Sequence, residues 1–391
     1  MQVDVIIEQR FYRCVLGQYW TENMFPNAFW QRYLQVFNRV NIVARVANVD
    51  IPETSWHRVD GERVGFIELP SYIGPAGFIK VLPKLIKVLH ARKRITRCVI
   101  FRIPSILAAI FQCFAMRRGE RFGAEVVGDP ADVFAKGASK SSLRLLFRSL
   151  FSAILKRQCQ QAISIAYVTE HRLQQRYPPN RTALSTHYSS IQLTDADYQQ
   201  RNGYPTSDAL HIVCVGNLAQ PYKGCDFMLQ GIAELKKIGL NISLTWVGGG
   251  ALLPSMQMLA KKLAISAHVS FEGNVSSRKN IHQILDNADL FVLSSRQEGL
   301  PRVLIEAMAR SLVCVATDVG GVDELLASGY IFDSDDINGL VQKVTMISNM
   351  TANERLTVSR RNYVVSENYH DLQLQVRREN MYRAVLKASQ C

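Results

Sequence analysis

Five short apolar runs in the second half of the chain constrain its fold more than any other feature. Each run ends at Gly, Ser or Asp and is followed by a stretch with helical periodicity; between residues 212 and 318 they read IVCVG, SLTWVG, VSFEG, LFVLS and VCVATD. Such alternation indicates parallel strands joined by crossover helices, with both faces of the sheet buried. Ligands bind beyond the carboxyl ends of strands in these sheets. The pattern therefore predicts a doubly wound α/β domain with a site at that edge.

Two glutamates follow the fourth run, within DLFVLSSRQEGLPRVLIEAMA. The pattern predicts a buried strand over Leu290 to Leu293, a polar loop that holds Glu298, and a helix opened by Pro301, because proline suits a first helical turn. Glu306 then lies about a turn and a half inside the helix. Carboxylates accept hydrogen bonds from sugar hydroxyls, and a helix N-terminus receives an anion. The pair suits a ligand that carries both hydroxyls and phosphate.

Structural roles would also explain these residues. Glu306 lies four residues from both Arg302 and Arg310, a spacing typical of a surface ion pair worth a few tenths of a kcal/mol. Glu298 could simply favour the dipole of the following helix. The motifs around Glu298 and Glu306 help to choose between these structural roles and a ligand site.

The C-terminal half resembles the donor domain of the retaining GT-B glycosyltransferases of the GT4 family (glycosyl transferases group 1), of the bacterial polysaccharide-biosynthesis type. Glu298 and Glu306 match the E-x7-E signature of that family. Four further segments resemble its pattern in order: VCVGNLAQPYKGCDFML (213–229), LTWVGGG (244–250), FEGNV (271–275) and VCVATDVGGVDELL (313–326). The resemblance is strong over about 200–345 and loose before that.

The resemblance implies a GT-B fold, in which two doubly wound Rossmann-like domains face a central cleft. We expect an acceptor-binding domain over 1–200, a donor-binding domain over 201–365, and a C-terminal helix over 366–391 that packs back on the first domain. A chain of 391 residues with 48% hydrophobic content can bury two cores. The polar stretch 195–210 is interpreted as the main linker. Strands are also expected in VDVII, VNIVARV, RVGFIEL, CVIFRI, AEVVGD and ISIAYVT.

The resemblance also implies roles for individual residues. Glu306 would hold the ribose hydroxyls and Glu298 the hydroxyls of the donor sugar, while Lys223 would stabilise the donor diphosphate. Glu324 would support the loop that closes the site. The remaining donor-binding residues would be Gly216, Asn217, Gly299, Leu300, Pro301, Arg302, Gly320 and Gly321.

Two positions depart from the family pattern. Family members usually carry a histidine after the strand equivalent to AEVV, where it contacts the donor sugar, and Asp129 occupies that zone here. Asp129 could equally be a turn-former before Pro130. Family members usually place an arginine where this chain has Asn217. Diphosphate neutralisation then rests on Lys223, on the helix N-terminus after Pro301, and on Arg296 or Arg302.

The resemblance implies transfer from a nucleotide-diphosphate sugar to a lipid-linked or polysaccharide acceptor, with retention of anomeric configuration and without a metal or other cofactor. The pairs Asp195/Asp197 and Asp333/Asp335 have the D-x-D form of a metal site, but neither follows a nucleotide-binding strand and turn. The eight histidines are scattered. A nucleotide-sugar epimerase and a non-catalytic sugar-nucleotide-binding or glycan-binding subunit remain alternatives with the same fold.

The positive charge lies in the N-terminal half. Residues 1–205 contain 28 Lys and Arg against 15 Asp and Glu, a balance of +13, whereas residues 206–391 contain 18 of each. A polyanionic partner is expected; no nucleic-acid-binding motif is present, so an anionic membrane surface or a lipid pyrophosphate is favoured. The basic residues expected to face a membrane are Lys80, Lys84, Lys87, Arg92, Lys93, Arg94, Arg97, Arg117, Arg118 and Arg121.

The eight cysteines form no C-x-x-C pair and are expected to be reduced core residues of a cytoplasmic protein. No signal peptide is recognised at the start of the sequence. The apolar segment 98–116 is divided by Arg102 and Pro104, so it is interpreted as a strand and a buried helix rather than a membrane span. We therefore expect a cytoplasmic protein that binds the inner face of the membrane peripherally.

Overall fold

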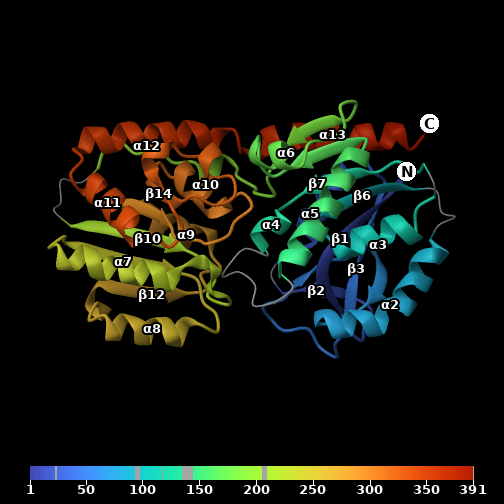
Figure 1. The fold of residues 1–391 in the computed structure, drawn as a ribbon, viewed down its shortest axis with the longest axis horizontal. Coiled ribbons are helices and arrows are strands. Elements are labelled where there is room, and N and C mark those ends of the chain that lie inside the picture. The colour runs from blue at the N-terminus through green and yellow to red at the C-terminus, as the bar shows by residue number, and fades with distance from the viewer. Residues whose placement is uncertain (23, 93–96, 118, 134–143, 205–208, 391) are drawn as a thin grey trace. The chain divides into compact units, whose positions relative to one another are not determined.

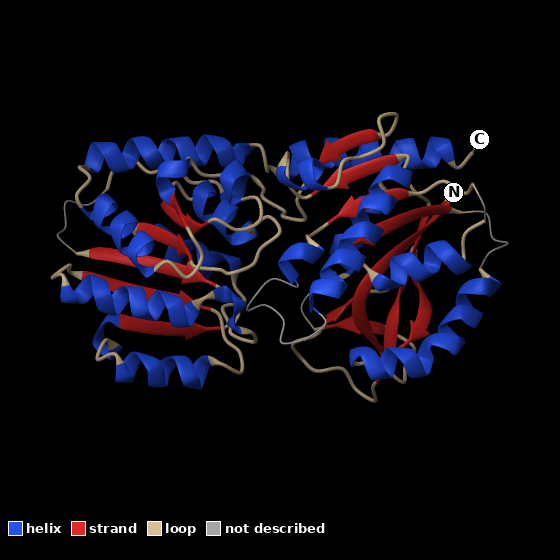
Figure 2. Ribbon diagram, viewed as in Figure 1, coloured by secondary structure: helices blue, strands red, loops and turns tan. Residues whose placement is uncertain are grey.

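The computed structural model divides into two compact units, each described by itself. The structure describes all residues except 23, 93–96, 118, 134–143, 205–208 and 391 (Figure 1). Unit 1 comprises Met1–Ala131, Leu145–Tyr188 and Gln375–Cys391, and unit 2 comprises Asp132–Arg144 and Ser189–Leu374. Figure 2 shows that helices border the strands of each unit.

Unit 1 contains a sheet whose parallel strands run in the order β5-β3-β1-β6-β7-β8-β9. The short strand β2 pairs antiparallel with β1, and β4 pairs antiparallel with β2. The strands are β1 (Gln2–Arg13), β2 (Tyr19–Thr21), β3 (Arg39–Asn48), β4 (His57–Arg58), β5 (Val64–Pro70), β6 (Cys98–Ile103), β7 (Gly123–Val126), β8 (Ser164–Tyr167) and β9 (Leu184–His187).

The helices around this sheet are α1 (Asn27–Leu34), α2 (Gly74–Ala91), α3 (Ile106–Phe114), α4 (Pro130–Val133), α5 (Arg144–Gln161), α6 (Arg172–Arg176) and α13 (Asp371–Ala388). The six strands expected in the N-terminal half are all present. The segment 98–116 is indeed strand β6 followed by α3. None of the helices in the described part of the chain is long and apolar enough to span a membrane.

The residues of α13 from Gln375 onward belong to unit 1 and pack on β7 and β8. Gly123 allows the close approach, because a Cβ there would lie 2.5 Å from Val385. The buried carboxylate of Glu125 accepts hydrogen bonds from the hydroxyls of Tyr382, Tyr33 and Tyr188 at 3.0, 2.9 and 2.8 Å, and it pairs with Arg102. Arg102 holds the pKa of this carboxyl below its usual range despite burial. A buried hydrogen-bonded cluster around Glu125 therefore fixes the C-terminal helix to unit 1.

Unit 2 contains a parallel sheet in the order β12-β11-β10-β13-β14-β15. Its strands are β10 (Leu210–Val215), β11 (Ile242–Val247), β12 (Val269–Gly273), β13 (Leu290–Leu293), β14 (Val313–Thr317) and β15 (Ile331–Phe332). Its helices are α7 (Cys225–Lys237), α8 (Leu253–Lys262), α9 (Arg278–Asp286), α10 (Arg302–Ala309), α11 (Ile337–Ser348) and α12 (Ala352–Glu367). Short 3₁₀ turns are η1 (Asp195–Asp197), η2 (Pro221–Lys223), η3 (Ser266–His268), η4 (Val322–Glu324) and η5 (Ser328–Tyr330). The five predicted strands are confirmed, and the sequence missed the short β15.

Both faces of the unit 2 sheet are buried, as continuous apolar runs predict. In β13, Leu290 and Val292 belong to the hydrophobic core that contains the buried residues of α7. Phe291 and Leu293 point to the other face and are also buried. The helices therefore cover the faces, and the loops beyond the strand ends are left to form a site.

The described residues of the stretch 195–210, which we interpreted as a linker, lie within unit 2. The hydroxyl of Tyr204 donates to the carbonyl of Ser311 at 3.0 Å and accepts from the amide of Val313 at 3.0 Å. These bonds tie the stretch to the beginning of β14. The described cysteines are free thiols, and among them only Cys113 is exposed.

Candidate functional site

The loops that follow β13 and β14 meet at the carboxyl edge of the unit 2 sheet. The amide of Gly321 donates to the carbonyl of Gly299 at 2.8 Å. Gly320 has a φ of +53°, and a Cβ at this position would lie 2.1 Å from the same carbonyl oxygen. Only glycine tolerates both the backbone angle and this approach. Gly299, Gly320 and Gly321 therefore form one compact backbone surface.

Lys223 and Glu298 form an ion pair at this edge. The ammonium Nζ of Lys223 lies 2.6 Å from Oε1 of Glu298, which also accepts the hydroxyl of Ser295 at 2.7 Å. The two charged side chains are 16% and 13% exposed. The lysine comes from the turn after β10 and the glutamate from the loop after β13. Two predicted residues 75 positions apart are thus brought together.

Two hydrogen bonds to backbone carbonyls hold the turn that carries Lys223 against the loop after β13. The hydroxyl of Ser294 donates to the carbonyl of Lys223 at 3.1 Å, and the amide of Arg296 donates to the carbonyl of Tyr222 at 2.7 Å. Gly224 has a φ of +71°, and a Cβ there would lie 1.9 Å from the carbonyl oxygen of Ser294. The Lys-Gly pair thus has a structural reason: glycine lets the lysine approach the loop after β13.

Arg296 does not provide the available cation that the sequence suggested. Its guanidinium bonds both carboxylate oxygens of Asp226 at 2.8 and 2.9 Å, and its Nε donates to Asp335 at 2.8 Å. These carboxylates raise the pKa of Arg296 above its ordinary value. Arg296 is therefore a structural link between the loop after β13 and the start of α7. Arg302 is exposed and makes no ion pair with any described residue, so it remains available.

Helix α10 begins one residue later than predicted. Pro301 occupies the N-cap position with extended backbone angles, and Arg302 is the first helical residue. Pro301 and Leu300 are buried, so they anchor the helix start against the unit. Because the first helical N–H groups have no partner inside the helix, the start of α10 offers donors near the Lys223–Glu298 pair.

Glu306 lines a cavity of about 150 Å³ together with Asp197, Arg278 and His282. Its carboxylate accepts no hydrogen bond from a described residue and forms no ion pair with one. Burial raises the pKa of Glu306 above its ordinary value, and Arg302 partly offsets this effect. Arg310, the other partner expected for a structural ion pair, binds Asp286 instead. The arrangement leaves Glu306 as a half-buried acceptor that faces a cavity.

Asp197 also lines this cavity and is bonded to several neighbouring residues. Its Oδ2 accepts from the amide and hydroxyl of Thr194 at 2.8 and 2.9 Å and from Arg278 at 3.1 Å. His282 lies 3.2 Å from its other oxygen, and burial lowers the pKa of that histidine. Asp197, the second aspartate of the first D-x-D pair, thus caps a turn and holds protein side chains.

The first glycine turn carries Gly216 and Asn217. The amide of Gly216 donates to the carbonyl of Val247 at 2.8 Å, which joins this turn to the end of β11. Asn217 is exposed, and its Oδ1 accepts the amide of Ala219 at 2.6 Å. Asn217 therefore stabilises its own turn.

Asp129 belongs to unit 1 and is 7% exposed. One carboxylate oxygen accepts the amide of Ala131 at 2.7 Å and the hydroxyl of Tyr177 at 2.5 Å. The other oxygen pairs with Arg176. The turn-forming role considered for Asp129 is present in the structure, and its carboxylate is already engaged.

The basic residues expected at a membrane divide into two groups. Lys80, Lys84 and Lys87 are exposed along α2, while Leu85 and Leu89 of the same helix are buried. The prediction was wrong for Arg97, which is 3% exposed and lies 3.0 Å from Asp4. Arg92 also pairs with Asp4, at 3.2 Å, and is only partly exposed. Arg117 and Arg121 are exposed; Lys93, Arg94 and Arg118 lie outside the described residues.

Sequence reasoning missed three polar residues near the carboxyl edge of the unit 2 sheet. Ser295 bonds Glu298, while Arg278 and His282 line the cavity beside Glu306. The Ser294-Ser295 pair at the end of an apolar run was a usable signal, because residues directly after parallel strands face the ligand edge. Arg278 and His282 lie on α9, and no spacing in the sequence links them to Glu306.

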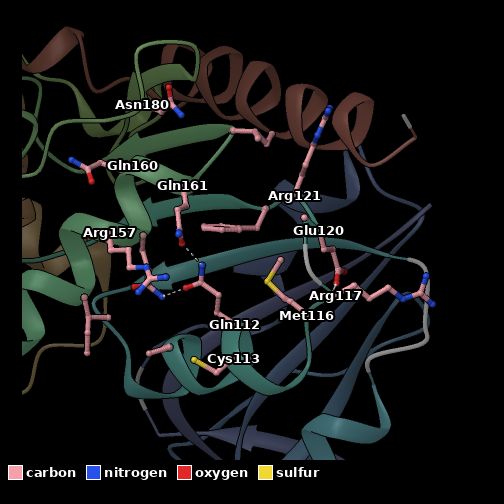
Figure 3. A pocket seen from close by; sticks show the side chains of 16 residues that line it. Gln112, Cys113, Met116, Arg117, Glu120, Arg121, Arg157, Gln160, Gln161 and Asn180 are labelled. Carbon is pink, nitrogen blue, oxygen red and sulfur yellow. Dashed lines mark hydrogen bonds between the residues drawn. The ribbon is translucent and has the colours of Figure 1, made fainter.

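A larger cavity of about 770 Å³ lies elsewhere, in unit 1 (Figure 3). Arg117, Arg121, Arg157 and a pair of hydrogen-bonded glutamines, Gln112 and Gln161, line it. Its residues precede β7, β8 and β9, so it opens at the amino edge of the unit 1 sheet. It is therefore not part of the glutamate and lysine site of unit 2.

A comparison with protein families decides how this site is interpreted. The family model described as Glycosyl transferases group 1 matches residues 209–349, which include Lys223, both motif glutamates and the glycine turns. The chain is a glycosyltransferase that matches the group 1 family over these residues. The match places the site residues of unit 2 within the region that defines the family.

Curated relatives of this glycosyltransferase include proteins from several bacteria. Protein CapJ of Staphylococcus aureus is 26% identical over 354 residues, which cover 90% of this chain and 88% of CapJ. A GDP-mannose-dependent alpha-(1-6)-phosphatidylinositol monomannoside mannosyltransferase of Mycolicibacterium smegmatis is 29% identical over 161 residues, covering 38% of this chain and 41% of that protein. The names of such relatives favour transfer over the epimerase and the non-catalytic subunit.

Solved structures show the GT-B fold for this glycosyltransferase. Sucrose-phosphate synthase from Thermosynechococcus elongatus aligns with a TM-score of 0.70 and 15% identity, over 99% of this chain and 100% of that one. Anabaena HepE in complex with UDP and glucose aligns with a TM-score of 0.64 and 13% identity, over 99% of each chain. The predicted fold class is confirmed.

Proposed function

We propose that this group 1 glycosyltransferase moves a sugar from a nucleotide-diphosphate sugar to a lipid-linked or polysaccharide acceptor, with retention of anomeric configuration. The observation that carries the proposal is the Lys223–Glu298 pair beside the start of α10, on the same edge as the glycine surface. A diphosphate needs cations and N–H donors, and a sugar needs acceptors. Two similar proteins support a nucleotide-linked donor: the mycobacterial mannosyltransferase is described as GDP-mannose-dependent, and HepE was solved in complex with UDP.

The residues proposed to bind the nucleotide sugar each contact a different part of it. Glu306 accepts the ribose hydroxyls within its cavity, because its carboxylate has no bond to a described residue. Glu298 accepts hydroxyls of the donor sugar while keeping its bond to Lys223. The backbone at Gly299, Gly320 and Gly321 lies against the donor without side chains to block it.

Stabilisation of the leaving diphosphate is the main catalytic contribution. Negative charge on the diphosphate grows as the glycosidic bond breaks, so fixed positive charge near it lowers the barrier. Lys223, Arg302 and the N-terminus of α10 provide that charge here, and Asn217 contributes a neutral amide in place of an arginine. In a front-face displacement the leaving phosphate accepts the acceptor proton, so no enzyme nucleophile is required and the configuration is retained.

The reaction is proposed to need no metal ion or other cofactor. One carboxylate of each D-x-D pair is already used within the protein: Asp197 holds Thr194 and Arg278, and Asp335 holds Arg296. Their positions are therefore explained by structural bonds. Positive charge from Lys223 and Arg302 takes the place that a divalent ion occupies in other diphosphate sites.

Peripheral membrane binding through unit 1 is proposed for the same enzyme. Lys80, Lys84 and Lys87 lie on the exposed side of α2, and the N-terminal half carries the net charge of +13. Each basic residue near an anionic surface contributes roughly 1 kcal/mol. Three or four engaged residues suffice for reversible attachment to the cytoplasmic face of a membrane, where a lipid-linked acceptor is presented.

A donor screen followed by product analysis tests this function. Uridine, guanosine and thymidine diphosphate sugars are first screened for protection against thermal unfolding, since a ligand at about 100 Kd adds roughly 2.7 kcal/mol. The best donor is then incubated with lipid-phosphate-linked saccharides, with and without EDTA, and the new linkage is determined by NMR. We expect the anomeric configuration of the new linkage to match that of the donor. The amount of product should be the same with and without EDTA. An inverted product contradicts retention, and EDTA inhibition reversed by Mg²⁺ or Mn²⁺ contradicts the metal-free reaction.

A further inference from the structure

The cavity of about 770 Å³ in unit 1 is not used by the proposed reaction (Figure 3). It lies between the C-terminal halves of α3 and α5, beside the segments that lead into β7 and β8. It therefore opens at the amino edge of the sheet, opposite to the edge where ligands of parallel sheets usually bind. Its volume lies within the range of roughly 300–1,000 Å³ that is typical of small-molecule sites.

Three glutamines form a hydrogen-bonded chain in the wall of this cavity. The amide nitrogen Nε2 of Gln158 donates to Oε1 of Gln112 at 3.3 Å, and Nε2 of Gln112 donates to Oε1 of Gln161 at 2.8 Å. Figure 3 shows Gln112 and Gln161 pointing toward each other. The chain joins α3 to α5 and orients the three amide groups.

The two ends of this chain keep unused hydrogen-bonding groups. Gln158 is 2% exposed, and its oxygen Oε1 accepts no hydrogen bond from a described residue. At the other end, Nε2 of Gln161 donates to no described residue. Buried polar groups are normally hydrogen-bonded, so the acceptor of Gln158 needs a partner from the cavity itself. An acceptor and a donor on one wall match a ligand rich in hydroxyls, because each hydroxyl both donates and accepts.

Arg157 adds a cation to these amides. It precedes Gln161 by four residues, so the two exposed side chains are neighbours on the surface of α5, and Arg157 bonds no described residue. Arg117 and Arg121 also line the cavity, but Figure 3 shows their side chains extending away from the glutamines. The carboxylate of Glu120, the acid among the described lining residues, accepts the amide of Arg117 at 2.8 Å. Arg157 is therefore the cation that can bind a ligand carboxylate beside the amides.

Apolar side chains complete the lining of the cavity. They include Met116, Ile154 and Ile163. A sugar ring carries hydroxyls at its edge and C–H groups on its faces, so it can contact both the amides and these side chains. A small inorganic anion would leave the apolar part of the lining without a contact.

We infer that this cavity binds a short segment of an acidic polysaccharide, built from sugars that carry a carboxylate. The inference rests on the proposed function and deepens it, because it gives the saccharide acceptor a second attachment point at the amino edge of the unit 1 sheet. Gln158 accepts a hydroxyl, Gln161 donates to another oxygen of the saccharide, and Arg157 binds the carboxylate. Sugars of a growing chain that do not react are thus held by the enzyme.

Calorimetric titration of the full chain tests the inference with a trisaccharide of galacturonic acid. A trisaccharide of galactose with the same linkage is the neutral counterpart, and inorganic phosphate is the small anion. The variants are Arg157→Gln, Gln158→Leu and Gln161→Glu; the last keeps the acceptor for Gln112 but replaces the free donor. Lys156→Gln is the matched control, because it removes a cation from the same helix at a residue that lines a different cavity.

The acidic trisaccharide is expected to bind about tenfold more tightly than the neutral one, since charge-assisted hydrogen bonds are roughly twice as strong as neutral ones. Arg157→Gln should remove most of this preference and keep the affinity for the neutral trisaccharide. Gln158→Leu and Gln161→Glu should weaken the binding of both trisaccharides by roughly twofold to tenfold, the effect of one neutral hydrogen bond. The control should stay within twofold of the wild type.

Absence of trisaccharide binding by the wild type, or unchanged binding by all three variants, would overturn the site. Equal affinity for the two trisaccharides would overturn the acidic ligand, and phosphate that binds as tightly as the acidic trisaccharide would overturn the saccharide. Thermal unfolding checks that each variant is folded, and Arg157 and Gln161 are exposed, so the test does not depend on the buried Gln158. Sugar transfer is measured separately: trisaccharide binding without transfer would contradict the proposed function, and transfer without trisaccharide binding would contradict this site alone.

Discussion

The ammonium of Lys223 and the carboxylate of Glu298 lie 2.6 Å apart. The pair joins the turn after β10 to the loop after β13, and Ser295 supports the same carboxylate oxygen. An ammonium has three N–H donors, so Lys223 can bond a phosphate and keep Glu298. Under the proposed function, the pair positions a cation for the leaving group and an acceptor for the sugar.

Lys223→Ala should reduce turnover more than donor affinity. Charge on the diphosphate increases toward the transition state, so loss of a fixed cation costs on the order of 10²–10³ in kcat, while nucleoside diphosphate affinity should change by roughly tenfold or less. Steady-state kinetics and calorimetry measure the two quantities. Lys237→Ala is the matched control, because that lysine forms an exposed pair with Glu234 at 2.7 Å. Equal losses in kcat and affinity would contradict the leaving-group role.

Glu306→Ala should weaken nucleoside diphosphate binding by roughly tenfold to a hundredfold, the value of a charge-assisted hydrogen bond. The carboxylate form accepts the ribose hydroxyls, and burial raises its pKa. Affinity should therefore be full above the raised pKa and fall as pH decreases through it, at a higher pH than for an ordinary glutamate. The ratio of wild-type to Glu306→Gln affinity isolates this effect, because titration of the phosphate cancels. A ratio that is constant with pH would contradict it.

Gly320→Ala should destabilise the protein and impair donor binding together. The left-handed backbone costs a non-glycine residue about 1–2 kcal/mol, and the added methyl group would meet the carbonyl of Gly299 at 2.1 Å. Gly239→Ala is the control: its φ is +85°, but nothing lies within 4 Å of the added carbon. Chemical denaturation should show a larger loss of stability for Gly320→Ala than for Gly239→Ala. Titration with the donor should show a loss of affinity for Gly320→Ala alone.

The strands and the donor-side loops could be predicted from the sequence because they depend on local patterns. Apolar runs such as LFVLS are buried on both faces whatever their partners, and glycine is required wherever backbones approach as at Gly320. Glu298 and Lys223 could be placed because residues after parallel strands share one edge of the sheet.

The partners of individual charges could not be predicted in the same way. Arg296, Arg97 and Asp129 each looked available in the sequence, and each binds a residue far away along the chain: Asp226, Asp4 and Arg176. Charge type and position give no information about such pairs, because they depend on how distant elements pack. The exposure of Lys80 and Lys84 was predictable because it follows from the periodicity of a single helix.

Replacing Lys80, Lys84 and Lys87 with glutamine should reduce binding to anionic vesicles. The three side chains are exposed on α2 above the buried Leu85 and Leu89, so the change removes charge without disturbing the core. At roughly 1 kcal/mol for each basic residue, the triple variant should lose on the order of a hundredfold in partition to anionic lipid. Binding by the wild type should also fall as salt rises, because surface charges are screened beyond about 8–10 Å at physiological salt.

Vesicle flotation with anionic and neutral lipids, at low and high salt, measures this binding. The triple variant Lys237, Lys261 and Lys262→Gln is the matched control, since it removes the same charge from exposed positions of unit 2. We expect the control to float with anionic vesicles like the wild type. Equal loss in both variants would show that net charge, rather than α2, determines attachment. Wild-type flotation on neutral and anionic vesicles alike would indicate hydrophobic insertion, for which the exposed Ile79 of α2 and Ile73 directly before it are candidates.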